Sequence, residues 1–309
     1  MKIKAVFAGT PAFALPSLRV LHELGIVAAV LTQPDKPQGR KGILTPSSVK
    51  AEAEKLGIPV LQPVKLKEDF TALKEVGADI MITCAYGQLL TQEVLDLFPK
   101  GVWNVHASLL PAYRGAAPIA RALMDGQTQT GVTIMKTELG LDTGDMLLSA
   151  ALPILKEDTA GTLTDKLSVL GAELIVKAVG LLESGNFCLA KQGEGFVCKK
   201  VTRTQVDFSR SAAEVSALIR GLSPAPLSFG TAGDTLLNFY FAEELPHTGN
   251  EPCGTVLNAT PKEGLIVKCG EGAVRITRLQ PAGGKVMSAR DFLNGRKLAE
   301  GARFDKPVL

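Results

Sequence analysis

Short apolar runs alternate with amphipathic segments along the first part of the chain. The apolar runs have the length of buried strands, and the segments between them repeat apolar residues at helical spacing. This alternation predicts βαβ units, and so an α/β fold with a mostly parallel sheet flanked by helices. The expected strands are 2–8, 26–32, 58–61, 79–84, 101–106, 131–136 and 145–154. The expected helices are 13–24, 48–56, 67–75, 91–96, 118–124 and 159–184.

The pattern changes after the last of these helices. Residues 192–207 are polar and basic with few helical signals, which favours a linker. One further helix is expected over 212–220, and short strands then follow at about 8–12-residue spacing, a pattern typical of a small β-barrel. The expected strands of this barrel are 227–231, 235–241, 254–258, 265–269 and 273–279. We therefore predict an α/β domain over 1–190, a basic linker over 191–206 and a barrel domain over 207–309.

The composition agrees with two globular domains. The chain has 309 residues, of which 46% are hydrophobic and 21% charged, and a formal net charge of +3. These values exclude a disordered chain, a collagen-like fibre and a coiled coil. The charge is unevenly spread: residues 36–50 carry four Lys or Arg and no acid, and residues 274–309 carry eight against three acids. Local basic surfaces of this kind suit a large anionic partner.

Targeting and redox signals indicate a cytoplasmic protein. The strongest apolar run, Ile26 to Leu31, is far shorter than the ~20 residues that span a bilayer. The first residues lack the apolar core and small-residue cleavage region of a signal peptide. The five cysteines are scattered and form no Cys-x-x-Cys pair, so we expect reduced thiols, no disulfide framework and no zinc site.

The strongest local signal for chemistry is the segment from Trp103 to Pro111. Asn104 and His106 lie two apart on a predicted strand, so their side chains share a face. They lie at the carboxyl end of that strand, where open α/β sheets bind their ligands. The placement predicts a functional pair, although capping of a strand end would explain the same residues.

Two loops add charged groups. The Gly-Leu-Asp-Thr-Gly-Asp turn places Asp142 at its crown, and an ordinary turn explains that composition equally well. An aspartic protease is excluded because the sequence has only one Asp-Thr-Gly.

The strand-to-helix connection over 32–46 is longer than the usual ~2–6 residues, and Lys36, Arg40 and Lys41 make it cationic. Other common motifs are absent: Gly-x-Gly-x-x-Gly, the phosphate-binding Gly-Lys-Ser/Thr, His-Glu-x-x-His and Gly-x-Ser-x-Gly, and a catalytic metal is not expected.

Taken in order along the chain, these motifs resemble the 10-formyltetrahydrofolate-dependent formyltransferases. The resemblance is carried by Asn-x-His followed by Ser-Leu-Leu-Pro, Tyr-Arg-Gly-Ala-Ala-Pro-Ile, Gly-Val-Thr-Ile-Met and Gly-Leu-Asp-Thr-Gly-Asp. Further marks are Phe-Ala-Gly-Thr-Pro-Ala-Phe-Ala near the start, Thr-Gln-Pro-Asp-Lys-Pro, Ala-Tyr-Gly-Gln and Gln-Pro-Ala-Gly-Gly-Lys-Val-Met-Ser-Ala-Arg-Asp-Phe-Leu-Asn-Gly near the end. The resemblance covers the whole chain and is densest over residues 1–154.

The resemblance implies a Rossmann-like formyltransferase domain followed by an OB-like barrel. The implied reaction moves the formyl group of 10-formyltetrahydrofolate to methionyl initiator tRNA, with no metal, no membrane partner and a monomeric enzyme. The implied catalytic residues are Asn104, His106 and Asp142. The implied folate contacts are Tyr86, Gly87, Gln88, Ser108, Leu109, Leu110 and Pro111. The implied tRNA contacts are the barrel and the basic residues Lys36, Arg40 and Lys41.

The chemistry of these side chains suits direct formyl transfer. Attack of an amine on the formyl carbon gives a tetrahedral adduct with a developing oxyanion, and Asn104 is a permanent donor for it. His106 can donate a second hydrogen bond or protonate the leaving folate nitrogen. Asp142 can support the protonated form of His106 and accept the amine proton. The distribution of these proton-transfer roles is a hypothesis.

Two other functions remain open at this point. A formyltransferase for a small amine, such as a glycinamide ribonucleotide or an amino sugar, would share Asn104, His106 and Asp142 without needing the barrel or the basic loop. A folate- or RNA-binding protein without catalysis would not need those three residues. The acceptor tested in an assay separates the first alternative, and any formyl transfer excludes the second.

Overall fold

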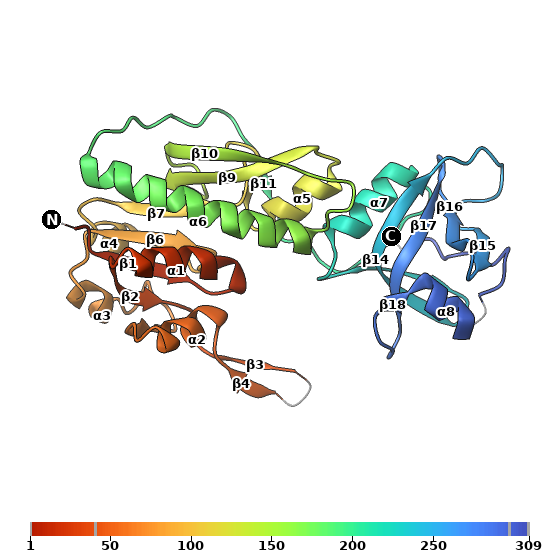
Figure 1. The fold of residues 1–309 in the computed structure, drawn as a ribbon, viewed down its shortest axis with the longest axis horizontal. Helices are drawn as coiled ribbons and strands as arrows, with labels where there is room; N and C mark the ends of the chain where they lie inside the picture. The colour runs from red at the N-terminus through yellow and green to blue at the C-terminus, as the bar shows by residue number, and fades with distance from the viewer. Residues whose placement is uncertain (1, 40–41, 296–297, 308–309) are drawn as a thin grey trace. The chain divides into compact units, whose positions relative to one another are not determined.

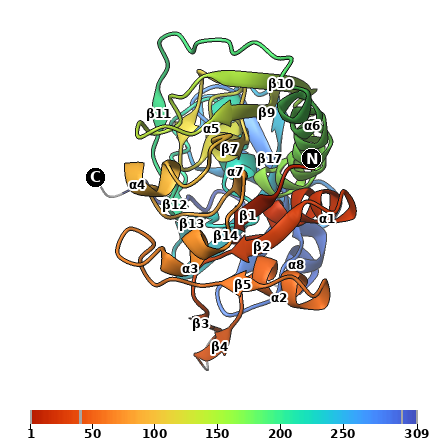
Figure 2. The same ribbon diagram turned by 90° about the vertical axis from the view of Figure 1, so that its left-hand side faces the viewer.

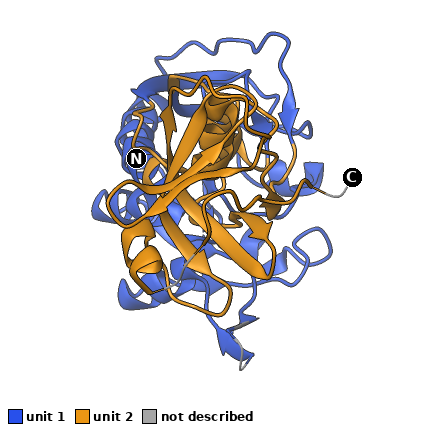
Figure 3. Ribbon diagram, turned by 90° about the vertical axis from the view of Figure 1, so that its right-hand side faces the viewer, with its two compact units in different colours: residues 1–115, 130–153, 164–198 blue, residues 116–129, 154–163, 199–309 orange. Residues whose placement is uncertain are grey.

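The computed structural model describes residues 2–39, 42–295 and 298–307. The chain folds into two compact units (Figure 3). Unit 1 consists of residues 1–115, 130–153 and 164–198, and unit 2 consists of residues 116–129, 154–163 and 199–309. No helix in the described part of the chain is long and apolar enough to cross a membrane. The expected division after residues 190 and 206 stays a prediction.

Unit 1 is built on a seven-stranded sheet in the order β10-β9-β7-β6-β1-β2-β5 (Figure 1). The pairs β1–β2, β1–β6, β6–β7 and β2–β5 are parallel, and β7–β9 is antiparallel. The mostly parallel sheet expected from the sequence is therefore confirmed. The strands are β1 (Ala5–Gly9), β2 (Val27–Leu31), β5 (Val60–Leu61), β6 (Ile80–Cys84), β7 (Val102–His106), β9 (Gln129–Lys136) and β10 (Met146–Pro153).

Helices cover both faces of this sheet, with α1 and α6 on one side and α3 and α4 on the other (Figures 1 and 2). The central strands β1 and β6 are buried along their whole length, which explains why they are continuous apolar runs. The helices are η1 (Ala12–Ala14), α1 (Leu15–Glu23), α2 (Ser48–Lys55), α3 (Thr71–Glu75), α4 (Gln92–Leu95) and α6 (Ala160–Ser184). Ser47 caps α2, since its side chain accepts a hydrogen bond from the Lys50 N–H at 3.0 Å.

Two short strand pairs of unit 1 were not expected from the sequence. The long connection over 32–46 contains the hairpin β3 (Lys36–Gln38) and β4 (Ile43–Thr45), which extends away from the sheet (Figures 1 and 2). The second pair is parallel and joins β8 (Arg114–Gly115) to β11 (Val197–Cys198). Each strand has only two or three residues, so neither leaves a readable periodic pattern.

Unit 2 is a second sheet with helices packed around an apolar core. Its strand order is β12-β13-β14-β17-β16-β15, and β18 pairs with β17. Phe208, Phe239 and Phe304 pack against one another in the core with ring centroids 5.3–6.2 Å apart. The strands are β12 (Thr204–Gln205), β13 (Ser228–Ala232), β14 (Thr235–Leu245), β15 (Val256–Thr260), β16 (Gly264–Lys268), β17 (Ala273–Pro281) and β18 (Met287–Ser288). The helices are α5 (Pro118–Met124), α7 (Ala212–Gly221) and α8 (Ala289–Gly295).

Candidate active site

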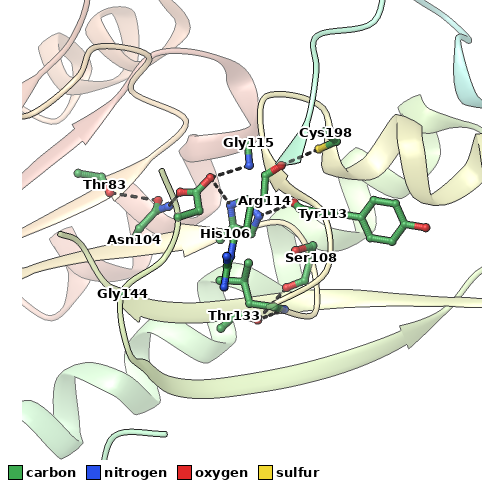
Figure 4. A network of polar contacts seen from close by, with 12 residues as sticks. Thr83, Asn104, His106, Ser108, Tyr113, Arg114, Gly115, Thr133, Gly144 and Cys198 are labelled. Carbon is green, nitrogen blue, oxygen red and sulfur yellow. Dashed lines mark hydrogen bonds and ion pairs between the residues drawn. The ribbon is translucent and has the colours of Figure 1, made fainter. Parts of the chain in front are cut away.

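Asn104 and His106 point from the carboxyl end of β7 toward one place (Figure 4). β7 lies between β6 and β9 in the sheet. Thr83 on β6 pairs with Asn104 and donates its hydroxyl to Asn104 Oδ1 at 3.1 Å. This bond orients the amide so that Asn104 Nδ2 donates to Asp142 Oδ1 at 3.3 Å. The face shared by Asn104 and His106 is therefore the face that meets the third predicted residue.

Asp142 reaches the pair from the turn after β9. Its backbone has φ +51°, in the left-handed region that few residues other than glycine adopt. Its Oδ2 accepts a hydrogen bond from the Gly115 N–H at 2.8 Å. The turn is narrow, because a Cβ at Gly144 would overlap the Lys136 carbonyl oxygen and one at Gly140 would overlap the Thr143 hydroxyl. The two glycines are thus required by the turn itself.

His106 lies between two acceptors. Its side chain is only 6% exposed, its Nε2 lies 2.9 Å from the Tyr113 carbonyl oxygen, and its Nδ1 lies 3.6 Å from Asp142 Oδ2. A neutral imidazole has one N–H and donates in one direction, whereas the imidazolium donates in both. Each ring nitrogen therefore faces an oxygen acceptor, the Tyr113 carbonyl on one side and the Asp142 carboxylate on the other.

The Ser108–Pro111 loop owes its shape to buried hydroxyl groups. Ser108 donates its hydroxyl to the Ala112 carbonyl at 2.7 Å. Thr133 on β9 donates to the Ser108 carbonyl at 2.7 Å and accepts from the Leu110 N–H at 3.2 Å. The side chain of Ser108 therefore fixes the loop, so that any contact with a folate here falls to other groups of Leu109, Leu110 and Pro111.

The Tyr86-Gly87-Gln88 loop is held in the same way. The Tyr86 carbonyl accepts from the Thr10 hydroxyl at 2.8 Å and from Gln33 Nε2 at 3.0 Å. Gln88 Oε1 accepts from the Leu66 N–H at 2.9 Å. Tyr86 is 4% exposed, and burial raises the pKa of its phenol to about 12. The Gln88 side chain therefore supports the loop, whereas the buried Tyr86 hydroxyl has no hydrogen-bond partner among the described residues.

A cavity of about 810 Å³ is lined in part by the turn that carries Asp142, and the sequence did not indicate it. Its wall includes Glu138, Leu139 and Gly140 from that turn. Its aromatic part contains Trp103, whose ring meets the ring of Phe187 edge to face at 6.1 Å. Its remaining lining is Gln92, Leu95, Asp96, Phe98, Pro99, Lys100, Gly101, Val102, Lys136, Thr137 and Leu189. The hydroxyl oxygen of Thr137 is buried and has no hydrogen-bond partner among the described residues.

The basic connection over 32–46 is only partly described. Lys36 donates its ammonium to Gln33 Oε1 at 2.6 Å, and the same glutamine binds the Tyr86 carbonyl. Arg40 and Lys41 lie outside the described residues. On the described part of the hairpin, Ile43 and Leu44 are 63% and 65% exposed. The tRNA contact of this loop stays a prediction.

Within the described ranges, no group of three or more His, Cys, Asp or Glu residues is arranged to hold a metal ion.

Comparison with known proteins identifies the family of this chain. Residues 1–179 match the family model described as formyl transferase, and residues 199–297 match that of the formyl transferase C-terminal domain. Methionyl-tRNA formyltransferase of Janthinobacterium sp. (strain Marseille) is 43% identical, covering 96% of this chain and 99% of its own length. The same enzyme of Rhizobium meliloti (strain 1021) is 45% identical, covering 98% and 99%.

A solved structure shares the fold. The N-formyltransferase of Helicobacter canadensis, crystallised with folinic acid and dTDP-3-aminofucose, superimposes with a TM-score of 0.65 at 19% identity. The superposition covers 89% of this chain and 99% of that one.

Proposed function

The chain belongs to the formyl transferase family, and from this membership we propose that it transfers the formyl group of 10-formyltetrahydrofolate to the α-amine of methionyl initiator tRNA. The product is N-formylmethionyl-tRNA, the initiator of protein synthesis. The relatives that carry the methionyl-tRNA name match nearly the whole chain at 43–45% identity, over both family segments. The observation that carries the chemistry is the convergence of Asn104, His106 and Asp142 at the carboxyl end of β7.

Asn104, His106 and Asp142 can each take a different role in formyl transfer. As the amine attacks the formyl carbon, the carbonyl oxygen becomes an oxyanion that needs donors aimed at it. Asn104 Nδ2 can supply one, since its bond to Asp142 is long at 3.3 Å. His106 can supply another and then give a proton to the folate nitrogen as the carbon–nitrogen bond breaks. Asp142 can take the proton that the attacking amine loses, so that charge balances when the adduct collapses.

The cavity lined in part by the Asp142 turn suits the pteridine ring of the folate. A flat aromatic ring needs apolar walls and a few polar groups that fix its orientation. The cavity has aromatic and aliphatic walls at Trp103, Phe187 and Leu95, and the unpartnered hydroxyl of Thr137 faces a buried environment where a polar ligand would satisfy it. In the neighbouring loop, the exposed residues Ala85 and Gly87 are then available to the rest of the folate.

The direct test is formyl transfer from 10-formyltetrahydrofolate to methionyl initiator tRNA, run beside free methionine and a small amine. Loss of one oxyanion donor should lower kcat by about 10²–10³-fold, so Asn104→Ala and His106→Ala should each be nearly inactive. His247→Ala is the matched control, because His247 pairs with Glu251 in unit 2 at 2.8 Å. Activity on the small amine alone would overturn the tRNA assignment, and full activity of both variants would overturn the assigned site.

A further inference from the structure

Gln192 lies beside the Asp142 turn although it is 50 residues away in the chain. The backbone just before it is fixed to the start of β10, because Met146 and Ala190 exchange two N–H···O bonds of 2.8 and 2.9 Å. The residue falls between the segments matched by the two family models, which end at residue 179 and begin again at residue 199. Neither match therefore assigns it a role.

The amide of Gln192 binds the turn that carries Asp142. Its Nε2 donates to the Asp142 carbonyl at 3.0 Å and to the Gly144 carbonyl at 2.6 Å. Asp142 has a positive φ, a conformation that costs a non-glycine residue free energy and persists where surrounding contacts hold it. The two hydrogen bonds from Gln192 supply such contacts, one at Asp142 itself and one at Gly144.

The oxygen of the same amide binds a second segment of the site. Gln192 Oε1 accepts from Arg114 Nη2 at 2.8 Å and from Arg114 Nε at 3.0 Å, and Arg114 Nη2 also donates to the Gly193 carbonyl at 3.0 Å. Arg114 stands between Tyr113, whose carbonyl meets His106, and Gly115, whose N–H meets Asp142. Figure 4 shows this segment curving around the His106 ring.

A glutamine amide meets the two requirements of this position, because it donates from its nitrogen and accepts at its oxygen. Arginine donates and never accepts, and a main-chain carbonyl accepts and never donates, so the group between them needs both functions. The same requirement fixes which end of the amide is oxygen and which is nitrogen. Glutamate would keep the contact with Arg114 and lose both bonds to the turn, and methionine would lose all of them.

We propose that Gln192 is a positioning residue that holds the Asp142 carboxylate in reach of Asn104 and His106, an inference that rests on the proposed function. Gln192 connects the Asp142 turn to the Arg114–Gly115 segment, so one side chain sets the distance between the catalytic carboxylate and its partners. Without it, the turn is free to relax from its left-handed backbone, and the carboxylate moves away from Asn104 Nδ2.

The first measurement is the effect of Gln192→Met on formyl transfer to methionyl-tRNA. We expect kcat to fall by about 10–100-fold, because an error of about 1 Å in a catalytic group costs up to about 10² in rate. KM for folate and for tRNA should stay within about twofold, because the residue acts on the carboxylate and not on either substrate. Gln192→Glu should behave alike if Gln192→Met does not fold. Gln127→Met, at an exposed glutamine in unit 2, is the matched control.

The second measurement does not depend on activity. The Gly115 amide resonance in a ¹H–¹⁵N spectrum reports the contact with Asp142 Oδ2, so it should shift and exchange faster in Gln192→Met and remain unchanged in Gln127→Met. In an Asp142→Asn background, Gln192→Met should add less than about threefold to the loss, because residues that act through one another are not additive. An unchanged Gly115 resonance, unchanged kcat or fully multiplicative effects would each overturn the proposal. An inactive wild-type protein with the expected Gly115 shift would instead overturn the proposed function alone.

Discussion

Burial separates the cysteines of this chain into reactive and unreactive thiols. Cys84 and Cys269 are fully buried, and burial raises the pKa of each thiol to about 12. Cys188 is exposed. Because the thiolate is the reactive form, we expect a thiol reagent at pH 8 to modify Cys188 first and to leave Cys84 and Cys269 unmodified until the protein unfolds. Mass spectrometry of the labelled peptides checks this order, and early labelling of Cys84 would contradict it.

At the scale of single residues, the sequence predicted those parts of the site that follow from local geometry. Asn104 and His106 share a face because alternate residues of a strand do. The position of Asp142 at the crown of a turn was also readable from its glycines. Gln192 was not, because its role depends on a tertiary contact with Asp142 and Arg114, and nothing in the neighbouring sequence marks it.

At the scale of elements, α6 contains two glycines at which an added methyl group should have opposite effects on stability. Gly171 of α6 faces β7, and a Cβ there would lie 2.9 Å from Val105 Cγ1, in the strand that carries Asn104 and His106. Gly180 of α6 is exposed, with nothing within 4 Å of an added Cβ. Gly180→Ala should raise the free energy of unfolding by about 0.5–1 kcal/mol, since alanine is the better helix former. Gly171→Ala should lower it by about 1–3 kcal/mol through overpacking.

Urea unfolding of the two variants measures both effects on the same helix. If Gly171→Ala were as stable as the wild-type chain, the packing of α6 against β7 would have to be looser than described. A destabilised Gly180→Ala would show that helix propensity does not decide the stability of α6.

The sequence predicted some of the helices and strands and missed others. The long strands and helices of unit 1 were predicted within a few residues because their periodicity extends over several turns. The expected helix over 67–75 begins only at Thr71, whose N–H donates to Asp69 Oδ1 at 3.3 Å in the preceding turn. α8 was not predicted, although Ser288 and Asp291 form a capping signal: Ser288 Oγ accepts from the Asp291 N–H at 3.1 Å.

At the scale of the whole molecule, the distribution of charge bears on the tRNA partner. A cavity of about 640 Å³ in unit 2 is lined by the basic residues Lys262, Arg275 and Arg290 and by one acid, Glu263. Arg275 already pairs with Glu243, at 3.6 Å between Nη1 and Oε2, and its Nε is buried. If tRNA binds to unit 2, we expect the basic residues of this cavity to contact its phosphates.

We expect Arg290→Ala to raise KM for methionyl-tRNA and to lower the slope of log KM against log salt by about 1, as for the loss of one phosphate contact. KM for folate should not change. Arg210→Ala serves as the control, because Arg210 is exposed and already paired with Glu214 at 3.0 Å. Kinetics at several salt concentrations measure the slope, and equal slopes for Arg290→Ala and the wild-type chain would contradict a phosphate contact at this cavity.

The position of Gln192 also determines how this protein could exchange parts with its relatives during evolution. A crossover at residue 190 would combine the Asp142 carboxylate of one parent with the Gln192 region of the other, because Gln192 lies beyond that point and Asp142 before it. A crossover after Cys198 would let both residues be inherited together, along with the β8–β11 pair. Recombinants between distant relatives should therefore survive selection more often when the junction lies after Cys198, beyond the end of the family match at residue 179.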